Sequence, residues 1–224
     1  MQHAKLNVSR ETSKKIDRYI ELLLSWNKKI NLISKHTEDD VLERHIIDSI
    51  QLSKFISTNT QELPSEVDGL MEGKKLDTSG SANQLTKKRI LDFGTGAGLP
   101  GIVLNIAGFN NITLVESIKK KCDFLEFVKK DLNLTANIVN DRVENIDNCN
   151  FDIITARAVA SLDKLFNLIA PLCKKNTKCL FLKGKKYKEE INNAEKLWKF
   201  KYKRYTSITS DESVILEITN IKSR

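Results

Sequence analysis

The chain has few cysteines, few histidines and no long apolar run, and each shortage excludes a class of protein. Its 4 cysteines include no CxxC pair and only 3 histidines accompany them, which argues against a disulfide framework or a metal cluster. No stretch approaches the roughly 18 unbroken apolar residues of a membrane span. The first residues lack the apolar core of a signal peptide. We therefore expect a metal-free cytoplasmic protein with reduced thiols, away from membranes and, by default, monomeric.

Acidic residues are also scarce relative to basic ones. The chain has 37 Lys and Arg against 29 Asp and Glu, a net charge of +8. Residues 1–88 carry 14 basic and 13 acidic groups, a net of +1, whereas residues 89–224 carry 23 and 16, a net of +7. An excess confined to one part of a chain attracts phosphate through its field and through counterion release. Compositional drift of the genome is the alternative, because 29 of the basic residues are Lys and only 8 are Arg.

Hydropathy divides the chain into three parts. Residues 1–56 have apolar positions at three- and four-residue steps, which predicts an N-terminal helical extension. Residues 57–88 contain no aromatic residue and many small polar ones, which predicts a flexible linker or insertion. In residues 89–224 short apolar runs alternate with helical stretches, which predicts a parallel α/β sheet with helices on both faces.

The order of elements in this last part can be predicted more closely. We expect helices between successive strands, and a final pair of strands that forms an antiparallel hairpin because no helical stretch separates them. The expected strands are 90–93, 112–115, 137–139, 151–156, 179–182, 202–207 and 214–218, and the expected helices are 99–107, 122–132, 162–169 and 188–198.

A glycine-rich segment, residues 92–101, follows the first expected strand and opens the first expected helix. Glycines let the backbone approach a ligand closely, and a helix start supplies free amides. Gly96-x-Gly98-x-x-Gly101 fits the dinucleotide fingerprint, and Glu116 lies 20 residues beyond Gly96, where an acid that binds ribose is expected. A nicotinamide dinucleotide is therefore one candidate cofactor.

The same segment fits the S-adenosylmethionine fold equally well. Gly94-x-Gly96-x-Gly98 follows Asp92 at the strand end, and Glu116 follows the second strand, where an acid binds the ribose hydroxyls of this cofactor. Asp92 favours this interpretation, because a carboxylate suits the cofactor's ammonium group and repels a pyrophosphate. The fold class expected is therefore the Rossmann-like sheet of a class I S-adenosylmethionine-dependent methyltransferase, with an antiparallel C-terminal edge and an N-terminal helical extension.

Two kinds of methylation chemistry are disfavoured by what is missing. Residues 155–161, after the fourth strand, differ from the Asn-Pro-Pro-Tyr-like segment typical of enzymes that methylate exocyclic amines. Methylation of pyrimidine carbon needs a cysteine nucleophile, and neither Cys149 nor Cys179 is well placed for that role. We interpret both, with Cys122 and Cys173, as small core residues. What remains is a nucleophile that attacks without covalent help.

Several motifs together resemble the RsmG family of bacterial 16S (small-subunit) ribosomal RNA guanine-N7 methyltransferases, also called the glucose-inhibited division protein B family. The resemblance covers nearly all of the chain except residues 57–88, where the family has a much shorter connection. The motifs are WNKKINL at 26–32, RHIIDS at 44–49, the glycine segment at 92–101, RVE at 142–144, RAVAS at 157–161 and LKG at 182–184.

The resemblance implies S-adenosylmethionine as cofactor and 16S ribosomal RNA, or the small ribosomal subunit, as partner. It implies that Gly94 and Leu99 lie at the glycine loop, that Val143 and Glu144 lie at the adenine, and that Arg157 completes the contacts. Guanine N7 has a free lone pair and no proton to lose, so we expect no catalytic base. The rate would come from positioning and from exclusion of water.

Polar residues near the strand ends are candidates for further contacts. Arg157 and Lys183 lie where ligands bind in open α/β sheets, and we hypothesise that they position an RNA phosphate or guanine O6. Lys185 fits a solvated turn and an RNA contact equally. His45, beside an apolar stripe, fits a hydrogen-bonded core residue; the resemblance makes His45 and Asp48 candidates for lining the site, without a catalytic role.

Three other functions remain open. The chain could methylate another RNA position or a small molecule, it could be an RNA-binding or ribosome assembly factor that has kept the fold without turnover, or it could use a nicotinamide dinucleotide. The basic excess of residues 89–224 disfavours a small-molecule substrate. Retention of Asp92, the three glycines and Glu116 disfavours loss of turnover.

Overall fold

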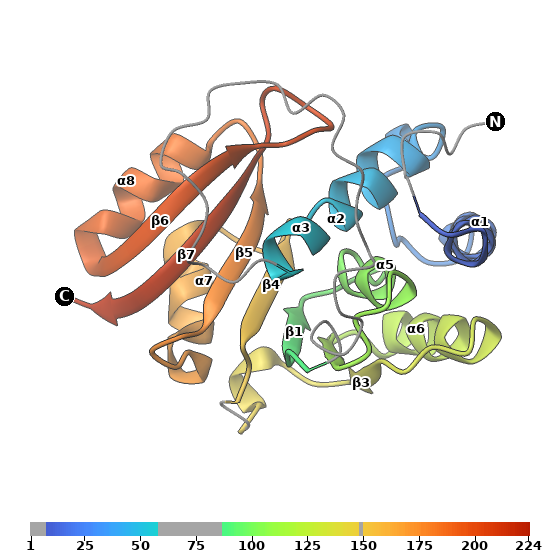
Figure 1. The fold of residues 1–224 in the computed structure, drawn as a ribbon, viewed down its shortest axis with the longest axis horizontal. Coiled ribbons are helices and arrows are strands. Elements are labelled where there is room, and N and C mark those ends of the chain that lie inside the picture. Colours follow the sequence, from blue (N-terminus) through green and yellow to red (C-terminus); the bar gives the residue numbers. More distant parts are fainter. Residues whose placement is uncertain (1–7, 58–86, 148–149) are drawn as a thin grey trace.

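The computed structural model describes residues 8–57, 87–147 and 150–224. Seven strands form one sheet in the order β3-β2-β1-β4-β5-β7-β6 (Figure 1). β1 to β5 are parallel, and β7 is antiparallel to both β5 and β6. This confirms the predicted Rossmann-like sheet with an antiparallel C-terminal edge. The strands are β1 (Ile90–Phe93), β2 (Ile112–Val115), β3 (Asn137–Val139), β4 (Ile153–Arg157), β5 (Lys178–Lys183), β6 (Trp198–Thr206) and β7 (Val214–Ser223).

Helices cover both faces of the sheet. One buried apolar cluster joins the N-terminal helices to α5, α6 and one sheet face, and a second joins α7 and α8 to the other face (Figure 1). The helices are α1 (Arg10–Asn27), α2 (Asp48–Ile50), α3 (Ser53–Ser57), α5 (Gly101–Ile106), α6 (Lys119–Asp131), α7 (Leu162–Ile169) and α8 (Tyr187–Leu197). Shorter turns are η2 (Lys35–Thr37), the π-helical η3 (Leu42–Ile47), η4 (Val143–Asn145) and η5 (Ala170–Leu172).

The N-terminal helices pack directly onto the α/β part of the chain. α1 begins after Ser9, whose hydroxyl accepts a hydrogen bond from the amide of Thr12 at 3.1 Å. Its apolar stripe includes Ile16, Tyr19 and Leu23, all fully buried, and the helix lies against α5 and α6. The predicted helical extension therefore shares its core with the sheet.

The last two strands are longer than the sequence predicts. The strand expected from residue 202 begins at Trp198, directly after α8. Trp198 and Phe200 both pack on Phe166 of α7, with ring centroids 5.8 and 4.9 Å apart. This packing holds the start of β6 in the sheet where we expected the end of a helix.

Other sequence predictions have mixed outcomes. Cys122 and Cys179 are buried, as expected, and Cys173 is half-buried. Cys149 and nearly all of the predicted linker 57–88 lie outside the described residues.

Over residues 8–57, 87–147 and 150–224, no helix combines the length and the apolar character needed to cross a membrane. Nor does that part of the chain contain a group of three His, Cys, Asp or Glu side chains able to hold a metal ion.

Candidate functional site

The candidate site lies where parallel strands end at one edge of the sheet. β1, β2 and β4 end at Phe93, Val115 and Arg157, and the carboxyl ends of parallel strands are where ligands bind in open α/β sheets. The turn between β1 and α5 contains three glycines in the left-handed backbone region, Gly94 at φ +59°, Gly96 at +58° and Gly98 at +91°. Only glycine adopts this conformation at little cost.

Two glycines of this turn allow close packing. A Cβ atom on Gly98 would lie 2.3 Å from Cγ1 of Ile102, and one on Gly101 would lie 2.1 Å from Cδ2 of Leu114. Both approaches are shorter than real carbon contacts, so any larger residue must displace its neighbours. These glycines bring α5 against β2 and thereby fix the shape of the turn.

The other two glycines lie at the exposed side of the turn. Gly94 approaches Val159, in the segment after β4, so that a Cβ atom would lie 2.8 Å from Cγ2 of Val159. At Gly96 the nearest atom to such a Cβ is the carbonyl oxygen of Gly94 at 3.9 Å. The turn therefore presents bare backbone to open space at Gly96, beside the end of β4.

Asp92 forms the internal support of the turn. Its carboxylate is fully buried and accepts hydrogen bonds from the Thr95 hydroxyl at 2.5 Å, the Thr155 hydroxyl at 2.8 Å and the Gly101 amide at 3.0 Å. Burial raises the pKa of Asp92 to about 6, and these hydrogen bonds oppose the rise. The expected partner was the ammonium group of the cofactor. The structure instead gives Asp92 partners in the turn and in β4, so direct contact with a cofactor stays a prediction.

Glu116 holds the same turn from the end of β2. One carboxylate oxygen accepts a hydrogen bond from the Gly96 amide at 2.9 Å, and the other accepts one from the Ile118 amide at 2.9 Å. A carboxylate has about four acceptor positions, so two remain for hydroxyl groups of a ligand. Glu116 therefore lies after the second strand, as its place in the sequence predicts, and its contact with ribose stays a prediction.

The remaining predicted cofactor residues lie around this turn with differing exposure. Leu99 is buried within the turn, and its amide donates to the Thr95 carbonyl at 3.0 Å. Val143 is buried at the start of η4, whereas Glu144 is exposed beside it. Contacts of these residues with a cofactor stay predictions.

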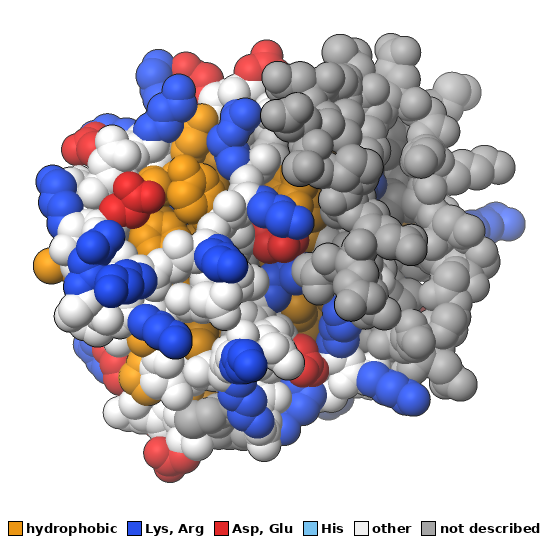
Figure 2. All heavy atoms as spheres, turned by 60° about the vertical axis from the view of Figure 1, so that its left-hand side comes forward, with side chains coloured by type: hydrophobic (Ala, Val, Ile, Leu, Met, Phe, Trp, Pro, Cys, Tyr) orange, Lys and Arg blue, Asp and Glu red, His pale blue; other side chains and the backbone are white. Residues whose placement is uncertain are grey.

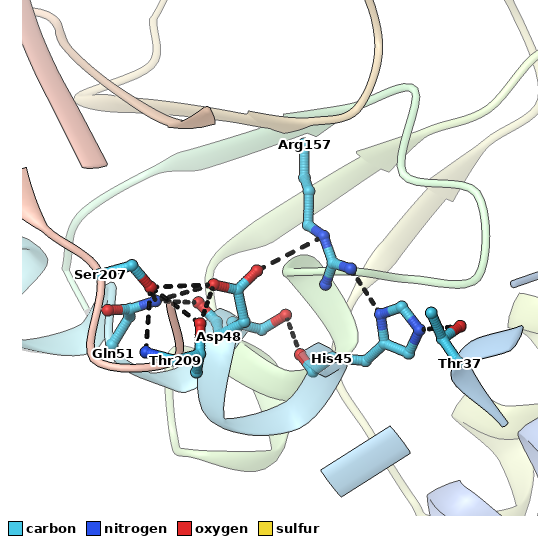
Figure 3. A network of polar contacts seen from close by, with 8 residues as sticks. Thr37, His45, Asp48, Gln51, Arg157, Ser207 and Thr209 are labelled. Carbon is cyan, nitrogen blue, oxygen red and sulfur yellow. Dashed lines mark hydrogen bonds and ion pairs between the residues drawn. The ribbon is translucent and has the colours of Figure 1, made fainter. Parts of the chain in front are cut away.

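Arg157, the last residue of β4, is held by two residues of the N-terminal helices (Figure 3). Its Nη2 lies 2.5 Å from Nδ1 of His45, and its Nε lies 3.6 Å from a carboxylate oxygen of Asp48. Burial lowers the pKa of Arg157, and the charge of Asp48 opposes this. Its third nitrogen, Nη1, is buried without a hydrogen-bond partner. The cluster thus orients a cation and leaves one donor for a ligand.

The hydrogen bonds around His45 define its protonation. The Thr37 hydroxyl donates to the Ser34 carbonyl at 2.7 Å, so it accepts at 2.8 Å from Nε2–H of His45. Nδ1 therefore carries the lone pair that accepts from Arg157. Burial, followed by the charge of Arg157, lowers the pKa of His45 to about 4. His45 is thus a buried, hydrogen-bonded neutral residue, as the sequence predicts, and it also contacts the site.

Asp48 connects Arg157 to the turn between β6 and β7 (Figure 3). The carboxylate oxygen that faces away from Arg157 accepts hydrogen bonds from Gln51 at 3.0 Å, Thr209 at 3.0 Å and Ser207 at 3.3 Å. Ser207 and Thr209 belong to the turn that joins the last two strands. Three distant parts of the chain therefore meet at this one carboxylate.

The lysines predicted to contact RNA have partners within the protein. Nζ of Lys183 donates to the Ala160 carbonyl at 2.6 Å and to Glu190 at 2.7 Å, and its side chain is only 8% exposed. This geometry argues against the predicted contact of Lys183 with RNA, because its charge is already neutralised inside the molecule. Lys185 is exposed and forms an ion pair with Glu212 at 2.8 Å.

Three site residues had no role assigned by sequence reasoning. The Tyr19 hydroxyl of α1 donates to the Ala97 carbonyl in the glycine turn at 2.7 Å, and burial raises the pKa of Tyr19, which keeps it a donor. Nothing distinguished Tyr19 from its apolar stripe. Thr155 carried a signal, because it is the one hydroxyl in the apolar part of the fourth strand. Thr95 lies three residues after Asp92, a spacing typical of a local side-chain hydrogen bond.

Solved structures with low sequence identity share the fold of this chain. The crystal structure of the tRNA (m1A58) methyltransferase TrmI from Aquifex aeolicus has a TM-score of 0.56 at 12% identity, over 90% of this chain and 76% of that one. A mutant of MtNAS in complex with S-adenosylmethionine has a TM-score of 0.50 at 13% identity, over 92% of this chain and 75% of that one. These likenesses support the class I methyltransferase sheet.

Sequence comparison identifies the family. The profile of GidB, rRNA small subunit methyltransferase G, matches residues 12–69 and 63–219. Ribosomal RNA small subunit methyltransferase G of Rickettsia rickettsii (strain Sheila Smith) is 36% identical over 216 residues, 96% of this chain and 98% of that protein. Its counterpart in Rickettsia typhi (strain Wilmington) is 37% identical over 217 residues, 96% of this chain and 98% of that protein. Together with the glycine turn, these matches show that the chain belongs to the rRNA small subunit methyltransferase G family.

Proposed function

We propose that this chain transfers the methyl group of S-adenosylmethionine to N7 of a guanine in 16S ribosomal RNA. Its membership of the rRNA small subunit methyltransferase G family supports the reaction and the RNA. The observation that carries the proposal is that the glycine turn, Glu116 and Arg157 lie at the carboxyl ends of the neighbouring strands β1, β2 and β4, with Nη1 of Arg157 buried and unpartnered. Buried donors in native proteins nearly always have partners, so a ligand is the natural acceptor for this one.

The residues at this edge fit the cofactor. Gly96 presents backbone to open space, Glu116 has acceptor capacity for the two ribose hydroxyls, and Arg157 offers a donor. We propose that these three residues hold S-adenosylmethionine together with Gly94, Gly98, Leu99, Val143 and Glu144, while Asp92 keeps the turn in shape.

The methyl transfer then requires little direct chemistry from the side chains of the protein. When bound, S-adenosylmethionine supplies a methyl group on a sulfonium, which a lone pair attacks directly. Guanine N7 has no proton to lose, so this chain needs no general base, and His45 is unsuited to be one because both of its ring nitrogens are hydrogen-bonded. The contribution of the protein is to orient the two reactants and to exclude water.

The partner we propose is the small ribosomal subunit or its RNA, met in the cytoplasm by a monomer. The net charge of +7 over residues 89–224 supports a polyanionic partner. That charge lies in the same part of the chain as the glycine turn and Arg157.

Mass spectrometry of 16S ribosomal RNA from cells with and without the gene tests this function. We expect one N7-methylguanosine to disappear without the gene. The intact gene and a Lys175→Gln control at the opposite end of the sheet should restore it, whereas Arg157→Gln should not. An unchanged inventory of N7-methylguanosine would contradict the proposal, and loss of a different methylated base would move the reaction to another position.

A further inference from the structure

β6, the outermost strand of the sheet, carries a row of four cations. Trp198–Thr206 contains Lys199, Lys201, Lys203 and Arg204 and no acidic residue, and all four side chains are exposed. Figure 2 brings the side of α8 and β6 forward and shows Lys and Arg side chains over much of that face, with fewer Asp and Glu. The edge of the sheet is therefore a concentrated source of positive charge.

The acidic residues of the β6–β7 hairpin do not neutralise these four cations. Within the described part of the chain, none of the four cations forms an ion pair. Glu217, directly opposite Lys203, is 6% exposed and pairs with Lys178 at 3.4 Å. Lys199 lies directly opposite Lys222, and like charges in that position destabilise a hairpin. Lys183, by contrast, is neutralised inside the molecule by Glu190, so what distinguishes β6 is four exposed cations in one short strand without an acidic residue.

Aromatic residues alternate with the lysines of β6. Phe200 packs on Phe166, and Tyr202, a residue 44% exposed, lies next to Phe200. Because alternate residues of a strand face opposite sides, Lys201 and Lys203 lie on the other face from Tyr202. Arg204 shares the face of Tyr202, and an exposed aromatic side chain next to a cation is a platform on which nucleic acid bases stack.

The row leads toward the candidate site. β6 and β5 are both antiparallel to β7, so β6 is parallel to β5 and ends at the same edge of the sheet as the glycine turn. The next residue, Ser207, donates to Asp48 at 3.3 Å, and Asp48 holds Arg157. The cations from 199 to 204 cover about 16 Å at ~3.3 Å per residue.

We propose that the exposed row of β6 is a docking surface for the phosphate backbone of the RNA substrate, outside the methylation site. This inference rests on the proposed function. RNA phosphates that follow this edge strand would neutralise the four cations and release their counterions. Tyr202 would stack on a base at the face that also carries Arg204, and the strand direction would lead the nucleic acid to Arg157. Lysines on an edge strand also prevent edge-to-edge pairing of sheets, and that alternative gives different results.

The test compares two variants that lose the same charge. The hairpin variant combines Lys199→Gln, Lys201→Gln, Lys203→Gln and Arg204→Gln. The control variant combines Lys129→Gln, Lys130→Gln, Lys174→Gln and Lys175→Gln, which lie at the opposite end of the sheet, in the last turn of α6 and in the segment before β5. The probes are small ribosomal subunits from cells that lack the gene, and 16S RNA extracted from them.

For the hairpin variant we expect the slope of log K against log salt concentration to become shallower by about 3, at ~0.7 to 0.9 for each phosphate that the protein no longer neutralises. Its KM for the small subunit should rise about tenfold or more, with kcat and the Kd of the cofactor unchanged. The control should resemble the wild type in all four quantities. Equal changes in both variants would mean that only net charge matters, which overturns the proposal.

Two further results would also overturn it. The hairpin variant could bind RNA normally and self-associate, which would assign the lysines to edge protection. It could also lose binding to phosphatidylserine vesicles while RNA binding stays intact, which would make the row a lipid-binding surface. Should the fourfold variant not bind the cofactor, Lys201→Gln with Lys203→Gln should show half the change in slope. A wild type that binds RNA by this row and does not methylate it would contradict the proposed function and leave the docking surface standing.

Discussion

The glycine turn and the Arg157 cluster lie at the same edge of the sheet and are held in opposite ways. In the turn, Asp92 and Glu116 accept hydrogen bonds only from neighbours within the α/β part of the chain. Arg157 also belongs to that part, yet its partners His45 and Asp48 come from the N-terminal helices. The turn is therefore held mainly from the α/β part of the chain, with one added hydrogen bond from Tyr19 of α1 to Ala97, whereas Arg157 is held only when the N-terminal helices dock.

Each region also contains a buried titratable group, and burial shifts the pKa values of the two groups in opposite directions. Asp92 is an acid whose pKa is raised by burial, and His45 is a base whose pKa is lowered by burial. In both cases the neutral form is favoured in the folded protein. Variants of the two regions should therefore differ in stability, in pH dependence and in cofactor binding.

Asp48→Asn should have the largest effect on stability. It leaves the Arg157 guanidinium, whose side chain is 18% exposed, without its counter-charge. Breaking a mostly buried ion pair from one side typically costs about 3 kcal/mol or more. We expect a loss of this size in the free energy of unfolding, measured by urea titration at neutral pH.

Asp40→Asn is the matched control for that measurement. Asp40 pairs with Arg44 at 3.4 Å, but both side chains are 61% exposed, so its removal should cost less than about 0.5 kcal/mol. Equal losses for Asp48→Asn and Asp40→Asn would show that the Arg157 cluster does not depend on its buried attachment.

The pH dependence of stability should separate the two regions. The folded pKa of Asp92 is about 6 against 3.8 unfolded, so the folded state binds the extra proton and stability falls as pH rises from about 4 to 6. The folded pKa of His45 is about 4 against 6.5 unfolded, so stability rises between about 4 and 6.5. Each effect is on the order of 3 kcal/mol, at 1.36 kcal/mol per pKa unit, and in the wild type they oppose each other.

Two single substitutions separate the contributions of Asp92 and His45 to the pH dependence of stability. In Asp92→Asn only the rise due to His45 remains, and in His45→Gln, which keeps a neutral acceptor for Arg157, only the fall due to Asp92 remains. Urea titrations at several values between pH 4 and 7, each compared with the wild type, measure the differences, so that groups common to all three proteins cancel. If the free energy of unfolding changes with pH in the same way in all three proteins, the opposite contributions of Asp92 and His45 are refuted.

Gly101→Ala tests how tightly the turn is built, with an intermediate effect. The new Cβ atom would lie 2.1 Å from Leu114 and 2.7 Å from the Asp92 carboxylate, and overpacking of this kind costs about 2 kcal/mol. We expect a lower melting temperature and weaker cofactor binding by calorimetry. Gly184→Ala, where a Cβ atom meets nothing within 4 Å, should change neither, and similar behaviour of both variants would contradict the close packing at Gly101.

The same comparison explains what could be predicted from the sequence. The glycine turn, Glu116 and the strand ends follow from local patterns, because the residues that shape them are close in sequence or lie on neighbouring strands. The partners of Arg157 could not be predicted, because His45 is 112 residues away and meets it only through the packing of whole helices. The predicted contact of Lys183 with RNA fails for a related reason. Its position at a strand end is local, but its partner Glu190 depends on how α8 returns over the sheet.

Tyr19→Phe should have the smallest effect and tests the hydrogen bond that Tyr19 of α1 donates to the glycine turn. Removal of the hydroxyl leaves the buried Ala97 carbonyl without its donor, which costs about 1 to 2 kcal/mol. Because Ala97 lies between Gly96 and Gly98, part of that cost should appear as weaker cofactor binding in calorimetry. Tyr202→Phe, which removes the hydroxyl of a residue 44% exposed, should leave stability and cofactor binding unchanged. If Tyr19→Phe lowers stability while cofactor affinity stays at the wild-type value, the turn is shaped by the sheet alone, and the dependence on the N-terminal helices is confined to Arg157.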